Sequence, residues 1–105
     1  MFARKVTFEV KPSAIPELTQ KFEKDVLPLL RKQQGFVDHI TLVAPEGRKA
    51  FGIMLWDTKE NAEAYNRTGY QEVLKTLSKL VEGTPKVETF EVANSTFHKI
   101  AAKGA

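Results

Sequence analysis

The sequence of 105 residues contains no cysteine. This absence excludes disulfides, thiol nucleophiles and thiolate metal sites, and it suits a reducing compartment. Histidine is also scarce, since only His39 and His98 are present and they are far apart in the sequence. No zinc-binding pattern of closely spaced histidines is therefore found, and we expect no metal site.

Long apolar segments are lacking as well. The longest runs from Ala50 to Trp56, far short of the roughly 20 residues of a membrane-spanning helix. The first ten residues, MFARKVTFEV, turn polar within four positions, whereas a signal peptide needs a longer apolar stretch. We therefore expect a cytoplasmic protein with no membrane partner.

Other features exclude further classes of function. The 6 glycines form neither a dinucleotide-binding fingerprint nor a phosphate-binding loop, and no serine has a nucleophile-elbow context. The formal net charge is +3, but the basic residues are interleaved with 13 acidic ones and form no stripe, so we expect no nucleic-acid partner.

What the sequence does contain is the composition of one globular domain, with 42% apolar and 28% charged residues. We expect a single domain over residues 1–105, with a core at about 3–93 and a C-terminal arm at about 94–105. Strict alternation predicts a strand over Lys5–Lys11, with Val6, Phe8 and Val10 on one face. Further strands are expected at Phe36–Val43, Lys49–Trp56 and Lys86–Ala93.

Two helical segments are expected between these strands. The first is capped by Ser13 or Ile15 and contains Pro28, which predicts a kink or a second short helix. Asp57 and Glu60 resemble a capping box that opens the second segment. Gly69 interrupts it, and the helical spacing then resumes and continues up to Gly83.

The element order is therefore βαββαβ, which predicts an α+β, ferredoxin-like fold with a four-stranded antiparallel sheet and both helical segments on one face. Lys49–Trp56 is apolar on both faces and should be a central strand. The open sheet face needs a cover, and a second copy of the chain is the simplest one. Phe97 and Ile100 in the C-terminal arm are expected to pack across this homodimer interface, the alternative being a frayed terminus.

Several segments together resemble the antibiotic biosynthesis monooxygenase (ABM) family of the dimeric α+β barrel superfamily. They are Gln34-Gly35-Phe36, Trp56-Asp57 with Glu60 beyond, EAYNRTGYQEVL, and the closing VETFEV. The resemblance implies a homodimer whose two sheets form a barrel, with a pocket between sheet and helices in each subunit. Some members oxidise aromatic polyketides with molecular oxygen and no metal or flavin, others degrade haem, and many have no assigned reaction.

The haem-degrading members pair a tryptophan with an iron-ligating histidine ten positions later, and they carry an asparagine on the first strand. The aligned positions here are Tyr65 and Lys75, and the first strand has no asparagine. A protonated lysine has no lone pair for iron. Haem degradation is therefore not expected, although His39 or His98 could supply a ligand from elsewhere.

The resemblance favours a cofactor-independent monooxygenase that acts on a small aromatic substrate, quinol-like or anthrone-like. For catalysis we expect His39 as a base, because its ordinary pKa is near 6.5, and Tyr65, whose hydroxyl could bond a substrate oxygen. Trp56 and Tyr70 are expected to contact the substrate. The alternatives are a solvent-facing histidine, a core tryptophan and tyrosines that only pack.

Glu9 is a further candidate for substrate binding. If the strand register brings it beside Glu91, the two carboxylates would raise one pKa and supply a proton acceptor, unless lysines neutralise them. The alternative function is a noncatalytic dimeric module that binds a small molecule or responds to stress.

Overall fold

The computed structural model describes residues 1–97. Its elements follow the expected order, with the first helical segment in three pieces and the second in two. They are β1 (Phe2–Val10), α1 (Ile15–Lys21), the π-helical turn η1 (Phe22–Val26), α2 (Leu27–Arg31), β2 (Phe36–Val43), β3 (Lys49–Trp56), α3 (Lys59–Arg67), α4 (Gly69–Leu77) and β4 (Val81–Glu91).

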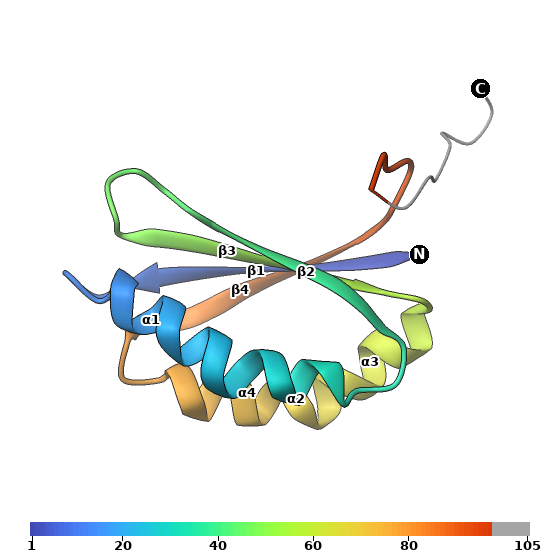
Figure 1. The fold of residues 1–105 in the computed structure, drawn as a ribbon, viewed down its shortest axis with the longest axis horizontal. Helices are drawn as coiled ribbons and strands as arrows, with labels where there is room; N and C mark the ends of the chain where they lie inside the picture. Colours follow the sequence, from blue (N-terminus) through green and yellow to red (C-terminus); the bar gives the residue numbers. More distant parts are fainter. Residues whose placement is uncertain (98–105) are drawn as a thin grey trace.

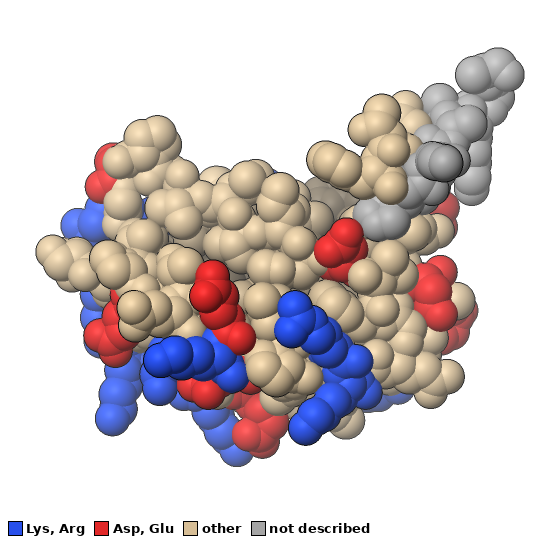
Figure 2. Space-filling model, in the orientation of Figure 1, with Lys and Arg blue, Asp and Glu red and all other residues tan. Residues whose placement is uncertain are grey.

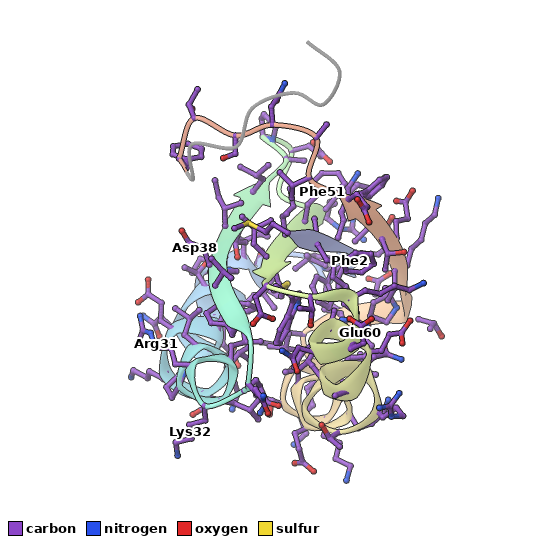
Figure 3. All side chains as sticks on the ribbon, turned by 90° about the vertical axis from the view of Figure 1, so that its right-hand side faces the viewer. Phe2, Arg31, Lys32, Asp38, Phe51 and Glu60 are labelled. Carbon is purple, nitrogen blue, oxygen red and sulfur yellow. The ribbon has the colours of Figure 1, made fainter. Side chains whose placement is uncertain are left out.

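The four strands form one antiparallel sheet in the order β2-β3-β1-β4. The helices cover one of its faces, as Figure 1 shows. Viewed from the end, α1 and α2 lie under the β2 side, while α3 and α4 lie beside them under β1 and β4 (Figure 3). The predicted ferredoxin-like fold is confirmed, including the central place of β3.

Side chains of β1 alternate between the two faces as predicted. Val6, Phe8 and Val10 are buried against the helices, while Lys5, Thr7 and Glu9 point to the open face or solvent. The strand begins at Phe2, earlier than the predicted Lys5, because the same alternation extends back through buried Arg4. A charged residue at a core position hid this extension from the hydrophobic pattern.

Pro28 interrupts the first helical segment in the expected way. The Leu27 amide donates to the carbonyl of Phe22, five residues earlier, and α2 starts directly afterwards with Pro28 in its first turn. Proline has no N–H to donate to the carbonyl four residues before it, so the helix inserts a wider turn. The predicted second short helix is confirmed, although no side-chain cap opens α1, whose N-cap is Ala14.

Two other predicted boundaries are wrong. Thr58, not Asp57, caps α3: its hydroxyl accepts from the Asn61 amide at 3.2 Å, so Asp57 and Glu60 form no capping box. The strand β4 starts at Val81, whereas the sequence predicted helical spacing up to Gly83 and a strand only from Lys86. A proline is tolerated there because β4 is an edge strand, where the missing N–H breaks no ladder inside the sheet.

The other sheet face is open in the described chain, and it carries a group of exposed apolar side chains beside the charged ones of Lys5, Glu9, Lys49, Lys86 and Glu88. Ile40, Leu42 and Phe90 lie on it with 49%, 47% and 49% of their surface exposed. Phe51 of β3 lies on the same side, away from the helices (Figure 3). In Figure 2 the visible charged side chains gather mainly over the helical layer, whereas the part of the surface above the sheet that faces the viewer is largely free of them.

Phe97 near the end of the described chain is 87% exposed, whereas Ile100 lies outside the described residues. The predicted role of the arm in a dimer interface therefore stays a prediction. In residues 1–97, none of the helices has the length and apolar character needed to cross a membrane.

Candidate functional site

The largely apolar cavity between sheet and helices lies under the β2 edge, where the helical layer bends at its π-helical turn. Its volume is about 260 Å³. Sheet and helix residues share its wall: Phe8, Leu18, Thr19, Phe22, Glu23, Leu27, His39, Thr41, Val43, Ala50, Gly52 and Leu77. Small-molecule sites usually enclose roughly 300–1,000 Å³, so this cavity suits a ligand of one or two rings.

His39 is the titratable ring in this wall. It occupies a helix-facing position of β2 opposite Met54, and its ring stacks on Phe22, with centroids 4.6 Å apart and planes at 21°. Its Nε2 is 2.6 Å from the hydroxyl oxygen of Thr41, two residues along the same strand face. The imidazole is therefore held from two sides, by an aromatic ring and by a hydroxyl.

Burial lowers the pKa of His39 from its ordinary value of 6.5, and the nearby Asp38 carboxylate partly opposes this effect. The ring is accordingly neutral at pH 7, with one nitrogen lone pair available to accept a proton. When that lone pair lies on Nε2, the Thr41 hydroxyl donates to it; in the other tautomer Nε2–H donates to Thr41. Either way, the cavity holds a neutral base against an apolar wall.

Three other predicted residues come together elsewhere, under the opposite half of the sheet. Trp56 and Tyr65 stack with centroids 4.9 Å apart, and Tyr70 lies 6.1 Å beyond Tyr65. Trp56 and Tyr65 are completely or almost completely buried, at 0% and 1% exposed, and they do not line the His39 cavity. The structure thus separates His39 from the three aromatic candidates.

Gly69 explains part of this packing, because a Cβ there would lie 2.8 Å from Cδ1 of Tyr65. The absence of a side chain at the start of α4 leaves room for the tyrosine ring. Burial raises the pKa of Tyr65 far above its ordinary value of 10.0, against the opposing influence of Arg4. Tyr65 therefore stays protonated, and its hydroxyl has no hydrogen-bond partner among the described residues.

Arg4 completes this cluster, and sequence reasoning missed it by counting it as a surface charge. Its guanidinium carbon lies 4.1 Å from the ring centroid of Tyr70 and 5.4 Å from that of Tyr65. A usable signal was present, because Arg4 continues the inward-facing series of Val6, Phe8 and Val10. Thr41 was missed as well, although it shares the strand face of His39.

Glu9 lies apart from both groups. The register places it opposite Lys49 and Glu82, whereas Glu91 pairs with Phe2 at the other end of β1. The idea of a Glu9–Glu91 carboxylate pair is therefore wrong, because the strands run antiparallel and set the two residues at opposite ends. Glu9 instead forms an exposed ion pair with Lys49 at 3.6 Å. Within residues 1–97, no group of three acidic or histidine side chains is arranged to hold a metal ion.

Sequence comparison identifies no relative: no family model and no curated protein matches the chain. Comparison of structures finds proteins with the same fold. A protein of unknown function from Nitrosomonas europaea, NE2512, superimposes with a TM-score of 0.75 at 18% identity, over 90% of this chain and 91% of that one.

Two oxygenases from Streptomyces share the fold as well. SnoaB of Streptomyces nogalater, a cofactor-independent oxygenase, gives a TM-score of 0.72 at 18% identity over 90% of this chain and 95% of its own. The monooxygenase ActVA-Orf6 of Streptomyces coelicolor, solved with the ligand nanaomycin D, gives 0.73 at 23% identity, over 90% and 88% of the two chains. Two structures described as putative antibiotic biosynthesis monooxygenases, from Nitrosomonas europaea and Bordetella bronchiseptica, give TM-scores of 0.71 and 0.72 at 15% identity, so the chain has the fold of the family that its sequence resembles.

Proposed function

We propose that this protein is a cofactor-independent monooxygenase that oxidises a small phenolic or quinol-like aromatic in the His39 cavity. The observation that carries the proposal is a neutral imidazole, stacked on Phe22 and hydrogen-bonded to Thr41, in the wall of an apolar cavity. The fold shared with SnoaB, a cofactor-independent oxygenase, supports it.

The chemistry requires a base, a dry cavity and molecular oxygen as the oxidant. His39 would take a proton from the substrate's hydroxyl or from the CH₂ of its keto tautomer, which leaves an electron-rich enolate. One electron passes to oxygen, and the substrate radical and superoxide combine into a carbon-bound peroxide anion, which takes the proton back from His39 and becomes a hydroperoxide. Loss of the remaining hydrogen with cleavage of the O–O bond gives a ketone, so that CH₂ and O₂ become C=O and H₂O.

The shape of the cavity favours substrates of limited size. Phe22 and Leu18 offer apolar contacts to a ring, while the polar groups in the wall are few, chiefly His39, Thr41 and Glu23. An aromatic ligand would be desolvated beside the base, which strengthens the interaction between them. We therefore favour one-ring and two-ring quinols over three-ring anthrones.

The proposed enzyme acts as a homodimer in the cytoplasm. The exposed apolar side chains of the open sheet face, Ile40, Leu42 and Phe90, support the dimer. The cytoplasmic location remains the expectation drawn from the sequence.

Oxygen uptake tests the proposed activity directly. The purified protein would be given hydroquinones, naphthols and anthrones in the presence of a metal chelator, with autoxidation subtracted. We expect saturable uptake that His39→Gln reduces by about 100-fold or more, the usual contribution of a general base. His98→Gln is the matched control, because it removes the sequence's other histidine.

Two results would contradict the proposal. One is a folded protein that consumes no compound faster than background, which would favour a noncatalytic binding module. The other is uptake that His39→Gln leaves unchanged, which would place the chemistry elsewhere in the molecule.

A further inference from the structure

Arg4 is unusual because it is a buried charge. Only 2% of its surface is exposed, and no other charged residue among residues 1–97 is buried in the core. Transferring a guanidinium from water into a protein interior is unfavourable unless an opposite charge or several hydrogen bonds compensate. Burial indeed lowers the pKa of Arg4. The groups around Arg4 should therefore offset the cost of burying its charge, and the described groups do so only in part.

The partners of Arg4 are neutral. Its Nη2 donates a hydrogen bond to Oδ1 of Asn66 on α3, and the guanidinium lies over the rings of Tyr70 and Tyr65. None of the ion pairs within the described residues involves Arg4. The positive charge is thus held by an amide oxygen, a hydrogen bond with the Tyr70 side chain and two aromatic faces, and no carboxylate within residues 1–97 forms an ion pair with it.

The cluster also has more donors than acceptors. Three buried polar atoms have no hydrogen-bond partner in the described chain, namely Nη1 of Arg4, Nε1 of Trp56 and the hydroxyl of Tyr65. The two nitrogens can only donate, and the hydroxyl can do so as well. Buried donors without acceptors are rare in native proteins and call for an explanation. For Arg4, an acceptor from outside residues 1–97 would satisfy the unpaired Nη1.

A cavity of about 180 Å³ adjoins the cluster under the β4 edge of the sheet. It is separate from the His39 cavity, since the two share no wall residue. Its wall combines apolar and polar side chains, namely Phe2, Arg4, Lys59, Ala62, Glu63, Asn66, Val87 and Thr89. Lys59 and Glu63 pair with each other at 3.9 Å, so Arg4 provides the unbalanced charge of this wall.

We propose that this second cavity binds a small organic monocarboxylate, whose anionic oxygens accept hydrogen bonds from the Arg4 guanidinium in its wall. A single negative charge matches the single unbalanced guanidinium, and a carboxylate suits the fork geometry of arginine. Phe2, Ala62 and Val87 would contact the apolar part of the ligand. The site is independent of the proposed oxidation, because His39 does not take part in it.

Trp56 provides the readout, because it is the only tryptophan in the sequence and stacks on Tyr65 in the cluster. Benzoate would be titrated into the whole protein while tryptophan fluorescence is recorded, and benzamide, a neutral molecule of the same shape, would be titrated in parallel. We expect a saturable change with benzoate and an affinity for benzamide at least about tenfold weaker, since bonds to charged groups are the stronger ones. Inorganic phosphate would be titrated in the same way, to test whether any anion binds as tightly as benzoate.

The variant Arg4→Met should weaken benzoate binding by at least about tenfold, because it removes the charge and keeps an apolar side chain. Arg67→Met is the matched control, since it removes an exposed positive charge at the end of α3 and should leave the affinity unchanged. The proposal is overturned if benzamide or phosphate binds as tightly as benzoate, if Arg4→Met binds like the wild type, or if no saturable change occurs. The comparison of benzoate with benzamide decides the matter even if Arg4→Met does not fold.

Discussion

His39 of β2 stacks on Phe22 of the π-helical turn, with ring centroids 4.6 Å apart. The two residues come from the sheet and from the helical layer, so their contact joins the two walls of the cavity. The turn exists where Pro28 prevents a regular helix, and π-helical turns occur often at functional sites. The proposed base is therefore held by a local irregularity of the fold.

The burial of His39 makes the stability of the protein depend on pH. Because its pKa is lowered in the folded state, the unfolded chain binds more protons between the folded value and 6.5. We therefore expect the free energy of unfolding to be unaffected above about pH 7 and to decrease as the pH falls through 6.5 towards the folded pKa. Urea unfolding of the wild type and His39→Gln at pH 7.5 and pH 5 measures the effect. If both proteins lose equal stability on acidification, the ring is not held neutral by burial.

Thr41 is expected to position the imidazole. Thr41→Val keeps the shape of the side chain and removes the hydroxyl that lies 2.6 Å from Nε2. One lost hydrogen bond corresponds to about 1 kcal/mol, so we expect kcat to fall by several-fold to tenfold with a smaller change in KM, and the acidic limb of the pH profile to shift. Thr41→Ser should restore both kcat and the profile. A hydroxyl that mattered only for folding would change neither pH limb.

Gly35 should be far less tolerant of substitution than Gly47. Both have positive φ, at 82° and 79°, but a Cβ on Gly35 would lie 2.7 Å from Cβ of Asn61 and would collide with Asp57, whereas nothing lies within 4 Å at Gly47. We expect Gly47→Ala to lower the free energy of unfolding by about 1 kcal/mol, the cost of a left-handed residue, and Gly35→Ala by about 3 kcal/mol because crowding is added. Urea unfolding of the two variants provides the comparison. Equal losses in the free energy of unfolding would mean that the backbone between α2 and β2 shifts easily to make room for the added Cβ.

The sequence predicted β2 and β3 with their correct bounds, because both are alternating or apolar runs that end at turn residues. The start of β4 could not be predicted in this way. Val81 to Pro85 carries helix-ending and turn-forming residues, and only the edge position of the strand makes them acceptable. The periodicity of apolar residues describes local structure. Whether a strand can contain a proline depends on whether the strand lies at the edge of the sheet, and this is decided by which strands pair.

The candidate site was predictable in part. His39 and the aromatic residues were identified from their residue types, but the separation of His39, in a cavity wall, from the buried aromatic cluster depends on which half of the helical layer lies over each strand. The burial of Arg4 was hidden because an arginine is normally read as a surface residue. Its hydrogen-bond partner Asn66 is 62 positions away in the sequence, and only folding brings the two side chains together.

The hydroxyl of Tyr65 is expected to contribute nothing to the stability of the unliganded protein. It is buried without a hydrogen-bond partner in the described chain, so Tyr65→Phe removes an unsatisfied polar group and keeps the ring that stacks on Trp56. We expect the free energy of unfolding to stay the same or to rise by about 1 kcal/mol. Thermal or urea unfolding without added carboxylate measures this effect. A loss of more than about 1 kcal/mol would show that the hydroxyl has a partner in solution.

The open sheet face leads to a prediction about assembly. Leu42 is 47% exposed on this face, between neighbours that are also apolar, so a charge there would be buried without a partner in a dimer that joins two sheets. We expect the wild type to have the mass of a dimer in size-exclusion chromatography with light scattering, and Leu42→Glu to have the mass of a monomer at the same concentration. Gln71→Glu adds the same charge to the helical layer and should leave the dimer intact. A wild-type monomer, or a Leu42→Glu dimer, would mean that the sheet faces do not meet and that the apolar surface has another cover.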